Sequence, residues 1–192
     1  MSNAPMNDDY STLARIIRDR RTNLIVDRDR TVSTEVVDEL CELATWAPNH
    51  KRTWPWRFAH LTGEARARLG TACADVMAAR GEEEARVTKT RGKYLRTPSV
   101  LVVGSEAGDS DLRTAENRDT VAAAVQNLLL GATARGLASF WSSCPKGAND
   151  VVAELCGFPA DTTIVAIVYL GHPAATAPVV ERPGVDVRHI DA

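Results

Sequence analysis

Residues 46–58 concentrate the side chains best suited to ligand chemistry. Three of the four tryptophans lie in this segment, and His50, Lys51 and Arg52 lie between its two prolines. Because proline stops helix propagation and keeps the residue before it extended, we expect a fixed loop. Flat rings beside hydrogen-bond donors suit a planar, anionic, nitrogen-rich ligand. A loop that anchors the core and carries a solvated basic turn explains the same residues equally well.

A second candidate is the run Arg20-Arg21-Thr22 at the end of an amphipathic segment. Two guanidinium groups provide forked donors, and a neighbouring hydroxyl adds one adaptable donor, which together suit a phosphate. Cations in the last turn of a helix also offset the helix dipole without binding any ligand. The motif alone does not decide between these two roles.

Several kinds of active site are disfavoured. The four cysteines and four histidines are scattered without the spacing of a metal site, so we expect no bound metal. Cys144 lies in a polar loop with no identifiable base nearby, and we interpret it as structural. The apolar run 99–104 lacks a following G-x-G-x-x-G motif, and residues 109–117 look like a polar stretch and not a helix. A dinucleotide-binding Rossmann unit is therefore disfavoured.

The elements that position these residues follow from apolar periodicity. Ser33 is a candidate helix N-cap, Gly136 and Gly157 are candidate C-terminal caps, and Asn149 is the candidate N-cap of the last helix. The solvated helical pair 63–80 and 82–95 could form a flexible flap, and we interpret the charge over 82–95 as a solvated face. Helices are predicted over 9–20, 34–46, 63–80, 82–95, 119–135 and 150–156, and strands over 56–61, 99–104, 137–141 and 162–170. This order predicts an α+β fold with a central sheet of four or five strands.

Composition predicts one domain over residues 1–192, with a flexible N-terminus at 1–8 and an extended arm at 174–192 that lies along a surface. The net charge of -2 gives no reason to expect a nucleic-acid partner. We also find no signal peptide and no apolar run near the ~20 residues that span a bilayer, so a cytoplasmic location without membrane contact is expected.

Three segments in this order resemble the FMN-dependent nitroreductase family. They are Arg20-Arg21-Thr22, the loop from Ala47-Pro48-Asn49-His50-Lys51 through Pro55-Trp56-Arg57-Phe58, and Gln126–Leu130 followed by Gly136–Trp141. The closest likeness is to small stand-alone bacterial members with an Ala-Pro-x-His-Lys loop. The resemblance covers roughly residues 13–173, and residues 64–97 are the least similar part.

The resemblance implies a mostly antiparallel α+β sandwich that forms a homodimer through its long helices, with FMN at the subunit interface. By position, Arg20, Arg21 and Thr22 would hold the phosphate and ribityl chain, and Trp141, Ser142 and Ser143 would meet the flavin. Trp46 and His50 would approach it from the partner chain, and Arg182 is a candidate phosphate contact. Where many members have Asn and Gln, this loop has Arg52 and Trp54. A guanidinium there would stabilise a reduced, anionic flavin, so Arg52→Ala should lower its reduction potential.

The function implied by this resemblance is an NAD(P)H oxidoreductase in which FMN carries the hydride to an electron-poor small molecule, such as a nitroaromatic or quinone. No side chain is assigned as catalytic. Alternatives are an enzyme of the same fold that performs flavin fragmentation or reductive dehalogenation, a non-catalytic flavin-binding dimer, and a flavin-free interaction domain. The acceptor and the choice between NADH and NADPH stay open.

Overall fold

The fold is built on one antiparallel sheet. The computed structural model describes residues 8–190. In spatial order its strands are β1 (Trp56–Leu61), β2 (Ser99–Ser105), β4 (Thr163–Gly171) and β3 (Ala138–Ser142). Every neighbouring pair is antiparallel. The predicted α+β class and antiparallel sheet are confirmed, with four strands. The antiparallel pairing of β2 with both neighbours also differs from the parallel sheet of a Rossmann unit.

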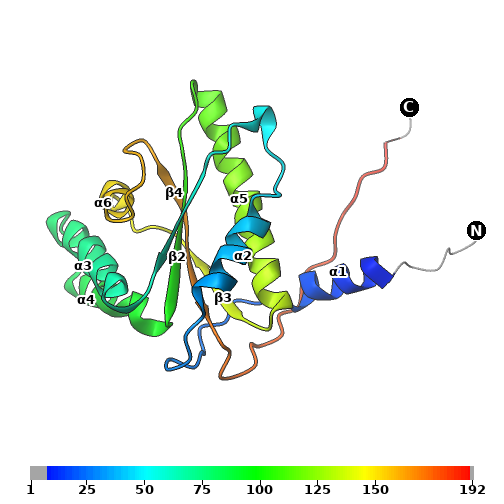
Figure 1. Ribbon diagram of the computed structural model, residues 1–192, viewed down its shortest axis with the longest axis horizontal. Helices are drawn as coiled ribbons and strands as arrows, with labels where there is room; N and C mark the ends of the chain where they lie inside the picture. Colours follow the sequence, from blue (N-terminus) through cyan, green and yellow to red (C-terminus); the bar gives the residue numbers. More distant parts are fainter. Residues whose placement is uncertain (1–7, 191–192) are drawn as a thin grey trace, which may run out of the picture.

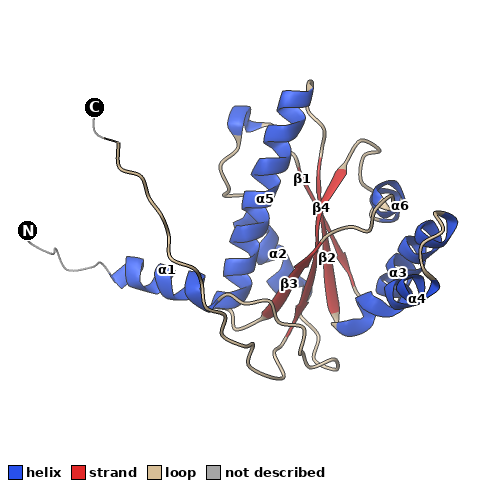
Figure 2. Ribbon diagram, turned by 180° about the vertical axis from the view of Figure 1, so that it is seen from behind, coloured by secondary structure: helices blue, strands red, loops and turns tan. Residues whose placement is uncertain are grey.

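Helices cover both faces of the sheet (Figures 1 and 2). On one face lie α2 (Thr34–Ala44) and α5 (Asp111–Ala134). The other face is covered by α3 (Gly63–Ala79), α4 (Glu84–Gly92), the 3-10 turn η2 (Lys93–Arg96) and α6 (Asn149–Leu155). This layering confirms the sandwich predicted from the sequence. Among residues 8–190, no helix is long and apolar enough to cross a membrane.

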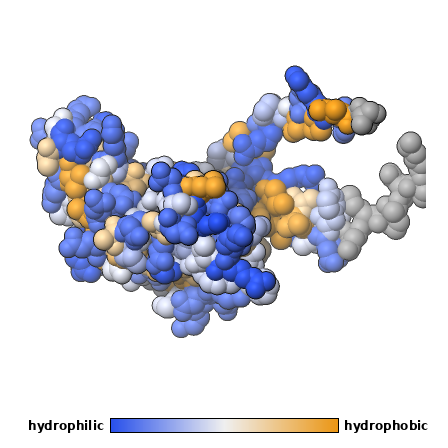
Figure 3. All heavy atoms as spheres, turned by 90° about the horizontal axis from the view of Figure 1, so that it is seen from above, coloured by the Kyte–Doolittle hydropathy of each residue, from blue (hydrophilic) through white to orange (hydrophobic). Residues whose placement is uncertain are grey.

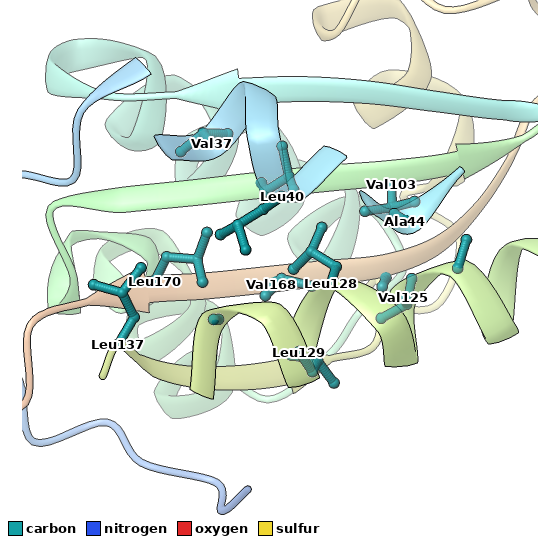
Figure 4. Close-up of a cluster of buried hydrophobic side chains, with 14 of the residues drawn as sticks. Val37, Leu40, Ala44, Val103, Val125, Leu128, Leu129, Leu137, Val168 and Leu170 are labelled. Atoms are coloured by element: carbon teal, nitrogen blue, oxygen red, sulfur yellow. The ribbon is translucent and has the colours of Figure 1, made fainter. Parts of the chain in front are cut away.

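The α2–α5 layer contains the larger hydrophobic core (Figure 4). Leu40, Leu128, Val103 and Val168 are completely or almost completely buried between these helices and the sheet. Burial of one such side chain contributes about 1.5–3 kcal/mol. Helix α2 begins as predicted, because the Ser33 hydroxyl accepts a hydrogen bond from the Val36 amide. These contacts hold α5 across the middle of the sheet.

Helix α5 begins earlier than predicted, at Asp111 and not at Asp119. The expectation of a non-helical polar stretch over 109–117 was therefore wrong. The hydroxyl of Ser110 caps the helix by accepting a hydrogen bond from the Arg113 amide at 3.2 Å, and Asp111 lies in the first turn, where a negative charge is favourable. The apolar periodicity fades in this first part of the helix because much of it faces solvent.

In the layer on the other face of the sheet, the predicted N-cap of helix α6 was wrong. Asn149 is not the N-cap of α6 but its first residue. Its side-chain amide donates to the Thr162 carbonyl at 2.9 Å and accepts from the Ile164 amide at 2.8 Å, so it ties α6 to the start of β4. Helix α4 packs on α3 through Val87, which is buried near Ala74 and Met77. The pair is packed against the sheet, because Leu69 and Cys73 of α3 are completely buried in the core on this face.

Two segments project from the body of the chain (Figures 1 and 3). Helix α1 (Asp8–Asp19) buries none of its residues, although it is amphipathic, and hydrophobic side chains gather on it. Residues 174–190 are extended, as predicted, but they lead away from the body and are almost entirely exposed. The arm does not pack on its own chain, and the prediction that it lies along a surface stays a prediction. The predicted flexible residues 1–7 and the last two residues of the arm lie outside the described part, and Asp8 is helical.

Candidate functional site

A cleft of about 340 Å³ lies between edge strand β3 and helix α4. Ser142 and Phe140 face it from β3, and Tyr169 faces it from β4. The Phe140 and Tyr169 rings are stacked, with centroids 5.5 Å apart and planes inclined by 17°. Tyr94 also stacks on Tyr169, with centroids 5.8 Å apart. The sheet therefore gives the cleft an aromatic wall formed by Phe140 and Tyr169, which suits a planar ligand.

The opposite wall of the cleft is strongly cationic. Its charged lining consists of five cations and one carboxylate: Arg86, Lys89, Lys93, Arg96, Lys146 and Glu82. Residues 86, 89, 90 and 93 recur at intervals of three and four, so α4 and the following turn direct them to one side. Glu82 pairs with Arg86. For the other four cations, residues 8–190 offer no ion-pair partner.

Lys93 is the most notable of these cations because it is only partly exposed. Its ammonium nitrogen lies 4.8 Å from the centroid of the Tyr94 ring. Burial lowers the pKa of the Lys93 amine, since desolvation disfavours the charged form. An anionic group in the cleft would offset this desolvation, so Lys93 is suited to hold negative charge on a bound ligand.

A second hollow, of about 500 Å³, lies farther along β3 and is lined in part by Arg21, Asn23 and Ala138. Ala138, Phe140 and Ser142 alternate along β3 and therefore face the same side of the sheet. Thr22 pairs with Ser139 in a parallel bridge, and the Asn23 amide donates to the Ser139 carbonyl at 3.1 Å. The second hollow thus lies at the Ala138 end of the edge strand, whose Ser142 end lines the cleft, and the segment that follows Arg21 runs beside that strand.

The cofactor-binding residues predicted along β3 and before it differ in whether their side chains line one of the two hollows. Arg21 donates to the carbonyls of Arg18 and Arg20 and lines the second hollow. The Trp141 indole packs against the α2–α5 core and donates to the Val165 carbonyl at 3.3 Å, so its ring faces away from the cleft. Ser142 lines the cleft, and Ser143 is exposed in the next loop.

Trp46 and His50 lie elsewhere in the chain, near α2 and α5. The Trp46 ring is 75% exposed, and its indole N–H donates to the Glu42 carboxylate at 2.7 Å. His50 Nδ1 lies 3.1 Å from Glu116 Oε1 and 3.2 Å from Arg113 Nη1. Neither residue lines the cleft of its own chain. Arg182 lies on the exposed arm, apart from Arg20 and Arg21.

The loop after His50 has an unusual backbone. Lys51, Arg52 and Trp54 have φ values of 64°, 53° and 49°. Positive φ is unfavourable for residues with a Cβ, and such conformations concentrate at functional sites. The Asn49 side chain supports this loop by accepting from the Trp54 amide at 2.9 Å and donating to Thr53 at 3.0 Å. These hydrogen bonds support one backbone conformation of the loop, in which the Trp54 side chain is exposed to solvent.

Our sequence-based reasoning missed the cations of α4. Arg86, Lys89 and Lys93 lie in the segment of weakest family resemblance, and we interpreted their charge as a solvated face. Their spacing of three and four residues was the available signal. Cys144 was interpreted as structural, and burial raises the pKa of its thiol to about 12. At neutral pH this thiol is protonated, which disfavours a nucleophilic role.

Comparison with known proteins agrees with this fold. The model of the nitroreductase family matches residues 17–172. One similar protein is YdjA of Escherichia coli K12, which is provisionally named an NAD(P)H nitroreductase. It is 28% identical over 132 residues, which cover 68% of this chain and 72% of YdjA.

Two solved structures have the same architecture. A nitroreductase-like family protein from Bacillus cereus superimposes with a TM-score of 0.77 at 28% identity, over 96% of this chain and 94% of the other. The FMN-dependent nitroreductase NfnB from Mycobacterium smegmatis, solved in complex with NADPH, gives a TM-score of 0.70 at 19% identity, over 90% and 95%. The family match covers most of the sequence and all four strands of the sheet, and this chain belongs to the nitroreductase family.

Proposed function

We propose that this protein is an FMN-dependent NAD(P)H oxidoreductase that reduces an electron-poor small molecule, such as a nitroaromatic or quinone. The observation that carries the proposal is the cleft beside β3, where an aromatic wall faces a row of cations. The M. smegmatis relative, whose name states FMN dependence and whose structure contains NADPH, supports the same choice of cofactor and reductant.

The residues present fit FMN. Arg20, Arg21 and Thr22 would hold its phosphate, because they combine two guanidinium groups with a hydroxyl beside the second hollow. Ser142, Ser143 and the main chain at Trp141 would line the edge of the flavin ring, against the wall formed by Phe140 and Tyr169.

Bound FMN supplies the redox chemistry, by accepting a hydride from NAD(P)H and passing it to the acceptor. The half-buried Lys93 cation would stabilise negative charge in the cleft, where the electrostatic effect of a fixed charge is larger than in water. The aromatic wall would exclude water from one side of the ring. No acid or base of the protein is required for the hydride step.

We further propose that two copies form the functional unit. Helix α1 buries nothing in its own chain, and next to it an apolar hollow of about 300 Å³ is lined by Leu13, Ile16, Leu43 and Leu130, among others. An exposed apolar surface of this kind is typical of an interface. The second copy would bring Trp46 and His50 to the flavin, and the projecting arm with Arg182 would reach the neighbouring subunit. Equilibrium sedimentation tests this: a monomer at micromolar concentration would contradict it.

The proposed reaction is tested by an anaerobic absorption experiment. The purified protein is loaded with FMN and mixed with NADH or NADPH, and the flavin band is followed. Bleaching with either nucleotide, reversed by a nitroaromatic or a quinone, is the expected result. A flavin band that neither nucleotide bleaches would indicate a flavin carrier, and failure to bind FMN would contradict the whole assignment.

The variant Lys93→Met tests the role of the Lys93 charge, because it keeps the length of the side chain and removes the charge. We expect weaker FMN binding and slower bleaching. Arg68→Gln on the exposed surface of α3 is the matched control, since it removes one positive charge outside the cleft. Equal effects of the two substitutions would refute a specific role for Lys93.

A further inference from the structure

The cations at the mouth of the cleft exceed what FMN alone requires. In the proposed site, Arg20 and Arg21 hold the single phosphate of FMN, and Lys93 is the partly buried cation inside the cleft. Arg86 and Lys89 on α4 and Lys146 on the loop after β3 remain. All three side chains are exposed, so they form the entrance. Within the described part of the chain, Lys89 and Lys146 have no ion-pair partner.

These three cations converge on one opening from two elements. Arg86 and Lys89 lie three residues apart, on the same face of α4 as Lys93. Lys146 lies beyond the end of β3, in the loop that leads to α6. Like charges grouped around a hollow repel one another, and an anion bound among them relieves this repulsion. The chain as a whole has a net charge of -2, so this opening is a local departure from the charge of the molecule.

We propose that Lys89 and Lys146, with Arg86, bind the 2′-phosphate of NADPH and thereby make NADPH the preferred reductant over NADH. The inference rests on the proposed function. The two nucleotides share their nicotinamide and pyrophosphate groups and differ only in this phosphate. A phosphate monoester carries a charge of about −1.5 to −2 at neutral pH and accepts hydrogen bonds through three oxygens. Guanidinium and ammonium groups are the side chains that bind such a group.

The expected size of the preference follows from the exposure of the three cations. One solvent-exposed ion pair changes affinity by roughly a factor of two to five. The two unpaired cations Lys89 and Lys146, with a smaller contribution from Arg86 because it is paired with Glu82, should favour NADPH by roughly tenfold or more in kcat/KM. Because the cations lie at the entrance and not at the reacting atoms, the preference should appear in KM. It should also decrease with salt, since the screening length falls below about 10 Å above 0.1 M ionic strength.

The experiment measures anaerobic flavin reduction in the FMN-loaded protein with each nucleotide. A preference for NADPH of tenfold or more supports the inference. The variant Lys89→Gln combined with Lys146→Gln should reduce that preference to less than threefold, by raising KM for NADPH while kcat and the reaction with NADH stay near wild type. Arg91→Gln is the matched control, because Arg91 lies on the same helix but pairs with Asp75 at 2.8 Å on the α3 side.

Several results would overturn the inference. Equal kcat/KM for the two nucleotides would do so while the proposed reductase function stands, whereas reduction by neither nucleotide would remove both. A strong preference for NADPH that survives the double substitution would show that the phosphate binds elsewhere. Competition in the wild-type protein gives an independent measurement that needs no variant: adenosine 2′-monophosphate should inhibit at least tenfold more strongly than adenosine 5′-monophosphate. Equal inhibition by the two monophosphates would contradict the assignment. It would also be contradicted if the double variant bound NADPH as the wild type does but lost binding of a nitroaromatic acid such as nitrobenzoate, because the cations would then bind the acceptor.

Discussion

Substitution of Gly70 by alanine should destabilise the protein and disturb the cleft together. Gly70 lies in α3 where the end of α4 crosses it. A Cβ added there would lie 3.0 Å from the carbonyl carbon of Arg91, still closer to the Arg91 oxygen, and 3.4 Å from the Thr90 oxygen. Favourable contacts between carbon atoms begin at about 3.5 Å. The obstructing atoms are backbone, so they cannot rotate away, and α4 must move away from α3.

The magnitude follows from two opposing effects. Overpacking lowers stability by about 1–3 kcal/mol, and a clash with helix backbone should lower it by about 3 kcal/mol, because backbone atoms cannot move aside. Alanine is favoured over glycine in a helix by about 1 kcal/mol, so the net loss of stability should be about 2 kcal/mol. For a protein of this size, that loss corresponds to a decrease in Tm of roughly 4–8 °C. Because α4 leads directly into Lys93, the displacement should also weaken FMN binding.

Urea denaturation followed by far-UV circular dichroism is the assay, with the slope m expected to stay constant. Gly92→Ala is the control, because a Cβ at Gly92 would meet no heavy atom within 4 Å. That substitution should leave stability unchanged or raise it slightly. If Gly70→Ala proved as stable as Gly92→Ala, the close packing of α3 on α4 described above would be refuted.

Three further substitutions or conditions test other parts of the structure. Lys51→Gly should stabilise the protein by up to about 1 kcal/mol, since glycine adopts positive φ without strain; a loss of stability would show that the lysine side chain contributes more than its backbone strain costs. Asn149→Ala should destabilise by about 1–3 kcal/mol, because it leaves two buried backbone groups at the start of β4 without partners, and an unchanged urea midpoint would contradict this. Burial raises the pKa values of Cys41 and Cys144 to about 12 and that of Cys156 to about 11. Their contribution to stability is therefore complete below the unfolded pKa near 9 and decreases as the pH rises from about 9 to 12; urea midpoints that stay constant over this range in reducing buffer would contradict it.

Apolar periodicity was sufficient to identify most elements, because buried faces impose it. The strand at residues 56–61 was predicted with the observed boundaries, and the helix at Gly63 with the observed start. The beginning of α5 was not, since its first turns face solvent and depend on the cap provided by Ser110. Asn149 was misassigned for a related reason: its amide is satisfied by a strand distant in sequence, and local capping rules do not include such partners.

The sequence by itself determined the fold class, the family and the loop between Pro48 and Pro55, because these depend on the order of residue types and on the backbone limits of proline. Only the tertiary structure brought the cations of α4 opposite the rings of Phe140 and Tyr169, since they lie about fifty to eighty residues apart along the chain. It also turned the Trp141 ring into the core while the neighbouring side chains of Phe140 and Ser142 face the cleft, because alternate residues of a strand face opposite sides of the sheet. Burial sets the pKa of Lys93, and burial is a property of the packed chain that the order of residues does not show.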